Sequence, residues 1–114
     1  MEPRGPHRAV SQLRRGVLEY CVLSLLARER LYAFDLVRRL SEVEGMVTSE
    51  GTVYPLLSRL RRVGWVDTDW VESTNGPPRR YYVLTDAGRE ALGAFSREWR
   101  QFRRGVDQLL GEGS

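Results

Sequence analysis

Hydroxyl, phenol and guanidinium groups gather on one face of a short segment, residues 49–62. The apolar residues of this segment recur at the spacing of a single helical face: Val53, Leu56, Leu57 and Leu60. The opposite face carries hydroxyls, a phenol and arginines: Thr52, Tyr54, Ser58, Arg59 and Arg62. Such groups suit phosphate oxygens and base edges, and the face has one acid, Glu50, near its start. The segment therefore predicts a helix that lies against nucleic acid.

Other chemistries find little support in the sequence. The chain has one cysteine, Cys21, and one histidine, His7, so it offers no intrachain disulfide and no cysteine-based metal site. It contains no nucleophile–base pair, metal-ligand set or phosphate-binding loop. We therefore expect no catalytic residues, no cofactor and no metal, and we predict that the protein is not an enzyme.

Length and charge are consistent with a small DNA-binding domain. A chain of 114 residues forms one domain with a modest core. The net charge of +3 permits a polyanionic partner without requiring one. No apolar run reaches membrane-spanning length and no signal peptide is visible. We therefore expect a cytoplasmic protein with no membrane partner.

Two helices are expected before the nucleic-acid-facing segment. After a flexible basic arm over residues 1–12, Leu13–Ala27 carries a wide apolar stripe. Leu31–Val43 forms the second helix, with these residues expected to face inward: Phe34, Leu36, Val37 and Leu40. A helix, a turn and a second helix with an arginine-bearing face are the helix-turn-helix pattern.

A β-hairpin follows. Gly64 stops the third helix, and Trp65–Glu72 then has the composition of a strand. Asn75-Gly76 is a hairpin-turn signal, and Arg79–Leu84 is the return strand. A hairpin with paired arginines near its tip, placed after a helix-turn-helix, predicts a wing that contacts DNA phosphates or a narrow minor groove.

The chain ends in one long helix over residues 86–110, capped by Thr85, with residues 111–114 as a tail. Its apolar residues are spaced alternately by three and four, as in a coiled-coil seam: Leu92, Phe95, Trp99, Phe102, Val106 and Leu109. So narrow a stripe needs one partner helix, and we expect the same helix of a second copy to supply it. The predicted fold is thus α+β but mainly α: a winged helix-turn-helix over residues 13–85 with a coiled-coil-like dimerisation helix.

Three stretches resemble the PadR family of bacterial transcriptional regulators, in its short subclass with a single C-terminal helix. They are LRRGVLEYCVLSLLARERLYAFDL, SEGTVYPLLSRLRRVGWV and GPPRRYYVLTDAGREAL, and they span most of residues 13–110. The resemblance implies a winged-helix homodimer that represses operators and often releases them on binding a small molecule. The expected contacts with double-stranded operator DNA are Tyr32, Ser49, Gly51, Thr52, Tyr54, Arg59, Gly76, Arg79 and Arg80.

The resemblance also suggests an effector site. A drug-sensing member of the family has a tryptophan that stacks on flat ligands, and Trp99 stands at the same offset after the wing-closing threonine, Thr85. The expected ligand-binding residues are Glu19, Phe95, Trp99, Phe102 and Arg103. Arg103 occupies the place of an acid in that member, so a neutral or anionic planar aromatic compound or a nucleotide suits the site better than a cation.

Two alternatives remain open. Trp99 can be a packed interface residue with no ligand. The winged helix can also be a protein-interaction module that does not bind DNA, because a fold does not determine a function. Arginines on the third helix and the wing favour DNA, although Asp67, Asp69 and Glu72 add negative charge to the wing.

Overall fold

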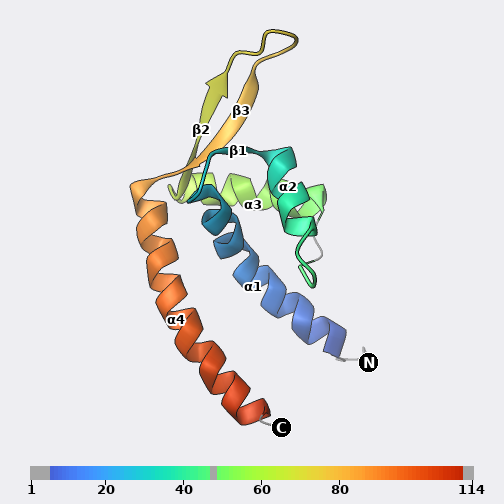
Figure 1. Cartoon of the computed structure of the whole chain (residues 1–114), viewed down its shortest axis with the longest axis vertical. Coiled ribbons are helices and arrows are strands. Elements are labelled where there is room, and N and C mark those ends of the chain that lie inside the picture. Colours follow the sequence, from blue (N-terminus) through green and yellow to red (C-terminus); the bar gives the residue numbers. More distant parts are fainter. Residues whose placement is uncertain (1–5, 47–48, 112–114) are drawn as a thin grey trace.

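The computed structural model describes residues 6–46 and 49–111, and for residues 6–12 and 15 it describes the backbone alone. Along the chain lie α1 (Pro6–Leu26), β1 (Leu31–Tyr32), α2 (Ala33–Ser41), α3 (Glu50–Arg62), β2 (Val66–Val71), β3 (Arg79–Leu84) and α4 (Asp86–Leu110) (Figure 1). This arrangement confirms the prediction of a mainly helical winged helix-turn-helix with a long C-terminal helix.

The core lies where α1, α2 and α3 meet the base of the sheet. Its fully buried side chains come from all of these elements: Val22, Leu23, Leu36, Val53, Leu57, Leu60 and Val66. Leu36 and Leu40 of α2 and Val53, Leu57 and Leu60 of α3 occupy the inner faces predicted from their spacing. Burial of this apolar surface holds α3 in place, so its polar face points outward.

The sheet has three antiparallel strands in the order β1-β3-β2. Two positive-φ glycines shape the wing: Gly64 (φ 86°) ends α3, and Gly76 (φ 152°) lies in the loop between β2 and β3. In the β2–β3 register, Val66 pairs with Leu84, Thr68 with Tyr82 and Trp70 with Arg80. Because side chains of directly opposed residues share a face, Arg80 lies on the face that also carries buried Val66.

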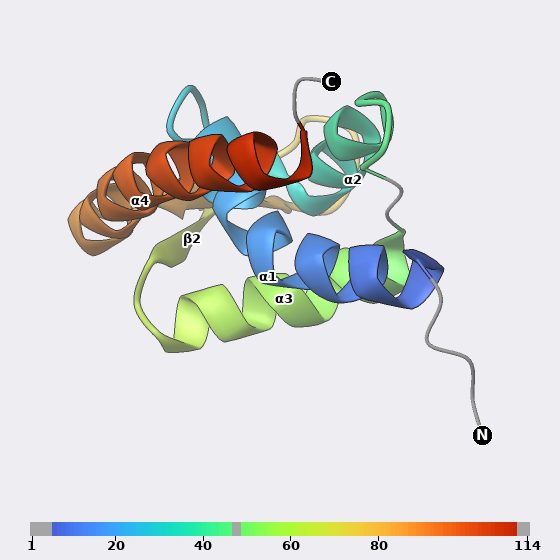
Figure 2. The same cartoon turned by 90° about the horizontal axis from the view of Figure 1, so that it is seen from below.

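Helices α1 and α4 extend away from the wing and carry the two chain ends at the opposite end of the molecule (Figure 1). Seen from below, α1 lies between α4 and α3 (Figure 2). The Thr85 hydroxyl fixes the start of α4: it donates to the Gly64 carbonyl at 2.7 Å and accepts from the Gly88 amide at 3.0 Å. Thr85 is therefore the predicted cap, and it also joins α4 to the end of α3.

Three sequence expectations were wrong. Helix α1 begins at Pro6 rather than Leu13, so residues 6–12 of the expected arm are helical; residues 1–5 lie outside the described part. The second helix begins at Ala33, because Leu31 and Tyr32 form β1, which pairs with β3. Phe34 was expected in the core but is 60% exposed. With Ala33, Leu36 and Leu40 buried along one side of α2, position 34 faces outward.

Candidate nucleic-acid interface

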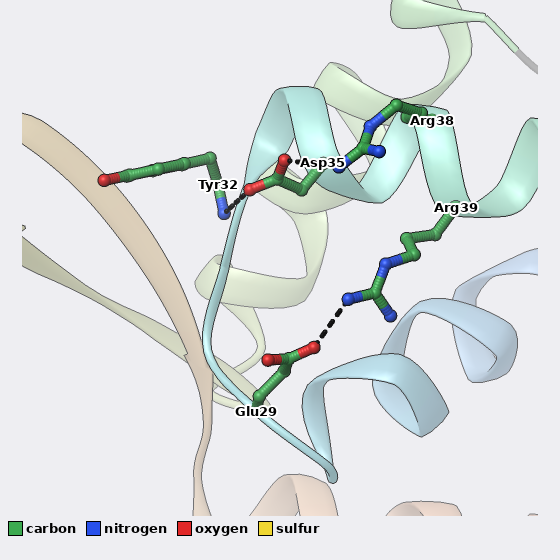
Figure 3. Close-up of polar contacts among 5 residues, drawn as sticks. All are labelled: Glu29, Tyr32, Asp35, Arg38 and Arg39. Carbon is green, nitrogen blue, oxygen red and sulfur yellow. Dashed lines mark hydrogen bonds and ion pairs between the residues drawn. The ribbon is translucent and has the colours of Figure 1, made fainter.

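The start of α2 is fixed by polar contacts at the edge of the interface (Figure 3). The Asp35 carboxylate accepts from the Tyr32 amide at 3.4 Å and from the Arg38 guanidinium at 3.2 Å. Arg39 donates to the Glu29 carboxylate at 2.6 Å and so ties α2 to the segment after α1. Arg38 and Arg39 are thus both paired with acids, while the Tyr32 ring extends away from α2.

The Tyr32 ring belongs to a stack on the outer face of the wing. It lies 4.0 Å from the Tyr81 ring, its cross-strand neighbour. The Arg79 guanidinium lies 5.1 Å from the centre of the Tyr32 ring, and that of Arg30 lies 4.6 Å from the centre of the Tyr81 ring. A hydrogen bond between the two phenols raises the pKa of Tyr81, so this phenol stays neutral at physiological pH. The stack holds Arg79 beside α3.

A groove of about 980 Å³ runs between the start of α2, the middle of α3 and β3. Four of the predicted DNA-contacting residues line it: Tyr32, Tyr54, Arg79 and Arg80. Phe34 and Ser58 line it as well, so the exposed ring of Phe34 belongs to this surface and not to the core. The groove brings together hydroxyls, aromatic rings and arginines from elements that are far apart in the sequence.

The other predicted contacts lie outside the groove. Ser49 is the N-cap of α3, and Gly51 and Thr52 are exposed in its first turn; Thr48 lies outside the described residues. Gly76 is exposed in the wing loop. Arg59 pairs with Glu19 of α1, whose side chain is only 14% exposed. Arg59 is therefore the one predicted arginine that is held by an acid.

A second hollow of about 330 Å³ adjoins the groove and is lined by Ser58, Arg61, Arg62 and Arg80. Arg61 was not identified from the sequence, because its position beside the wing depends on the angle between α3 and β3. For Arg80, the sequence carried a usable signal. Side chains alternate between the two faces of a strand, so Arg79 and Arg80 had to lie on opposite faces of β3.

A separate cavity of about 440 Å³ lies between α1, α2 and α4. Phe95 and Trp99 line it, and Tyr20 stacks on Phe95 with ring centres 4.0 Å apart and planes 2° from parallel. The other residues expected to bind a ligand, Glu19, Phe102 and Arg103, are not part of its lining within the described chain. Its lining also includes polar side chains that were not predicted: Tyr20, Cys21, Ser24, Arg28, Arg39 and Ser96.

Burial shapes the titration of two groups in this cavity. It raises the pKa of the Cys21 thiol, which therefore stays protonated near neutral pH. Burial also raises the pKa of Tyr20, with a smaller contribution from the Glu19 carboxylate, so its phenol stays neutral. In the described residues, no group of three or more His, Cys, Asp or Glu side chains is placed to hold a metal ion.

The end of α4 exposes the seam residues Phe102 (60%) and Leu109 (87%), together with Leu110 (83%). Nearer the start of α4, Leu92, Phe95 and Trp99 are partly covered by the same chain. Within the described part of the chain, no helix has the length and the apolar character needed to cross a membrane.

Comparison with known proteins gives one consistent result. Residues 22–94 match the family described as transcriptional regulator PadR-like. A PadR-like transcription factor from Bacteroides fragilis is 45% identical, with 84% of this chain and 92% of that chain covered and a TM-score of 0.73. A PadR-like regulator from Bacillus cereus is 34% identical (90% and 99% covered, TM-score 0.81). One from Eggerthella lenta is 36% identical (92% and 91% covered, TM-score 0.78).

Proposed function

The chain belongs to the PadR-like family of transcriptional regulators, and we propose that it is a cytoplasmic homodimeric repressor that binds double-stranded operator DNA. In this proposal α3 enters the major groove and the wing lies over the adjacent minor groove. Membership of a regulator family agrees with the prediction that the protein is not an enzyme.

The groove between α2, α3 and the wing is the observation that carries this proposal. It presents Tyr54 and Ser58 of α3 beside Arg79 and Arg80 of β3. Hydroxyl and phenol groups can bond base edges or phosphates, and guanidinium groups bind phosphates in a fork geometry. The wing acids Asp67 and Asp69 share a face of the sheet with Arg79 rather than with Arg80, as their pairing with Val83 and Tyr81 requires.

Recovery of genomic DNA fragments on the purified protein tests the proposal. We expect a small set of fragments that share a pseudo-palindrome and bind more tightly than random DNA by at least about a thousandfold. Tyr54→Ala should weaken binding to these fragments more than binding to random DNA. Retention of no fragment above background would favour a protein-interaction module.

A planar effector is the second part of the proposal. Phe95 and Trp99 present aromatic surface to the 440 Å³ cavity, and Arg28, which forms no ion pair with any described residue, places positive charge at it. Such a site suits a flat anionic or neutral aromatic compound or a nucleotide. A compound that releases DNA must bind the DNA-free state more tightly than the DNA-bound state.

Tryptophan fluorescence tests the effector. We expect planar aromatic acids to quench Trp99 and to weaken operator binding, and Trp99→Ala to lose both effects while remaining folded and dimeric. Trp65 and Trp70 also emit, so the variant assigns the signal. If no planar compound binds the wild type and Trp99→Ala becomes monomeric, Trp99 is a packing residue.

A further inference from the structure

The arginines of the winged helix-turn-helix differ in whether they form an ion pair with a carboxylate. Four of them have carboxylate partners: Arg30 with Asp69 at 3.7 Å, Arg38 with Asp35, Arg39 with Glu29 and Arg59 with Glu19. Arg61, Arg62 and Arg80 form no ion pair with any described residue, and all three line the 330 Å³ hollow with Ser58. Arg79 also has no carboxylate partner among the described residues, but it lies over the Tyr32 ring. Three unpaired guanidinium groups therefore gather between the last turn of α3 and β3.

The position of Arg80 is fixed by aromatic contacts. Its guanidinium lies 5.8 Å from the centre of the Trp70 ring and 5.4 Å from that of Tyr82. These rings hold the group by cation–π attraction without neutralising its charge. Within the described chain, its buried Nε has no hydrogen-bond partner.

Stabilisation of the helix end explains only part of this cluster. Arg61 and Arg62 lie in the last turn of α3, where positive charge interacts favourably with the helix dipole. Arg80 comes from a different element, and the dipole does not account for its place beside them. The wing acids Asp67 and Asp69 lie on the other face of the sheet, so they do not neutralise the hollow.

We propose that Ser58, Arg61, Arg62 and Arg80 bind one phosphate of the DNA strand that separates the two grooves. This proposal rests on the proposed function. When α3 occupies the major groove and the wing the neighbouring minor groove, the strand between the grooves passes between α3 and β3, where the hollow lies. Fork-shaped guanidinium donors and a hydroxyl match the oxygens of a phosphodiester. The site positions the protein on DNA and reads no base.

Single methylphosphonate linkages, which remove the charge of one phosphate, test this site. Each linkage of a selected operator is replaced in turn, and binding of the wild type, Arg61→Ala and Arg80→Met is measured by anisotropy. We expect one linkage per half-site at which replacement weakens the wild type by about tenfold but weakens both variants by less than about twofold. Arg97→Ala, on the opposite side of α4 from the seam, removes the same charge and should keep the full loss at that linkage.

Salt dependence gives an independent readout. Because both arginines contact the same phosphate, the double variant should lower the slope of log affinity against log salt by about one unit per half-site. A reduction of about two units per half-site, or an equal loss at every linkage in all proteins, would overturn the shared site while leaving DNA binding intact. If the wild type binds no DNA, the proposed function fails together with the site. Arg61 is exposed, so Arg61→Ala keeps the test valid even if Arg80→Met unfolds the wing.

Discussion

Arg79 and Arg80 are neighbours in the sequence and both border the groove, yet their side chains lie on opposite faces of β3. Arg79 lies over Tyr32 on the outer face of the wing, and Arg80 lies over Trp70 and Tyr82 on the face toward α3. Arg59 differs from both, because the Glu19 carboxylate already neutralises it. At the scale of single residues, the acid partner of each arginine decides whether its charge is available to DNA.

Removal of the Glu19 charge tests this view. Glu19→Gln should free Arg59 and tighten operator binding by about two- to fivefold, since partly exposed ion pairs contribute at most about 1 kcal/mol. Glu29→Gln is the matched control: it removes the same charge but frees Arg39, which lines the α1–α4 cavity rather than the DNA groove. Equal affinities of the two variants in an anisotropy titration would show that Glu19 does not restrain Arg59.

At the scale of elements, Gly88 explains why α4 starts where it does. A Cβ at this position would overlap the Trp65 carbonyl oxygen and lie 2.6 Å from the Leu84 side chain. Only glycine therefore lets the first turn of α4 lie against Trp65, in the segment between α3 and β2, and against Leu84 of β3. This contact fixes the direction in which the long helix leaves the domain.

Gly88→Ala should lower the free energy of unfolding by about 1–3 kcal/mol, as overpacking of a tight contact does. Gly93→Ala is the control on the same helix, because its nearest contact would be the flexible end of Arg97 at 3.7 Å. That variant should be neutral or stabilise by about 0.5–1 kcal/mol, the usual preference for alanine in helices. Similar thermal midpoints for the two variants would show that α4 does not need the close approach.

Local sequence patterns predicted most elements, and long-range contacts account for what they missed. The bounds of β3 and α4 agree with the prediction because turn residues and Thr85 mark their ends. β1 has two residues and no periodicity of its own, and it exists through pairing with β3. Residues 6–12 were expected in a flexible arm, but α1 begins at Pro6, and proline is favourable in the first turn of a helix.

The candidate site was predictable only in part. The polar face of α3 could be predicted from the helical spacing of its apolar residues, and the wing arginines from their place after the hairpin turn. The Glu19–Arg59 pair and the hollow beside Arg61 join elements that no local pattern connects. The roles of the predicted DNA-contacting, ligand-binding and dimerisation residues stay predictions.

At the scale of the whole molecule, the two candidate sites lie apart and share α2. Asp35 lines the DNA groove at the start of this helix, and Arg39 and Leu40 line the α1–α4 cavity at its end. A ligand in the cavity would therefore contact a helix that also borders the DNA. A ligand in the cavity can release DNA through α2 only if the position of this helix differs between the DNA-free and DNA-bound states.

Dimerisation also belongs to this scale. Phe102→Glu with Leu109→Glu places charges on the exposed seam of α4, far from the core, so each protomer should stay folded while the dimer dissociates. Operator binding should fall by at least about a hundredfold, since one half-site then binds alone. Arg97→Gln with Arg104→Gln, off the seam, lowers the net charge by the same two units and is the control. A sedimentation experiment in which the seam variant stays dimeric at micromolar concentration would place the interface elsewhere.

Hydroxyl-radical footprinting on a selected operator tests the central claim most directly. A dimer that uses α3 and the wing should protect two symmetric half-sites, with centres about 34–36 Å apart or a multiple of that distance. In each half-site, protection should cover the DNA strand that separates the major groove under α3 from the minor groove under the wing. Tyr54→Ala should lose protection in both half-sites, whereas Arg97→Ala should keep the wild-type pattern. A single continuous protected stretch without symmetry, or a wild-type pattern in Tyr54→Ala, would contradict the account.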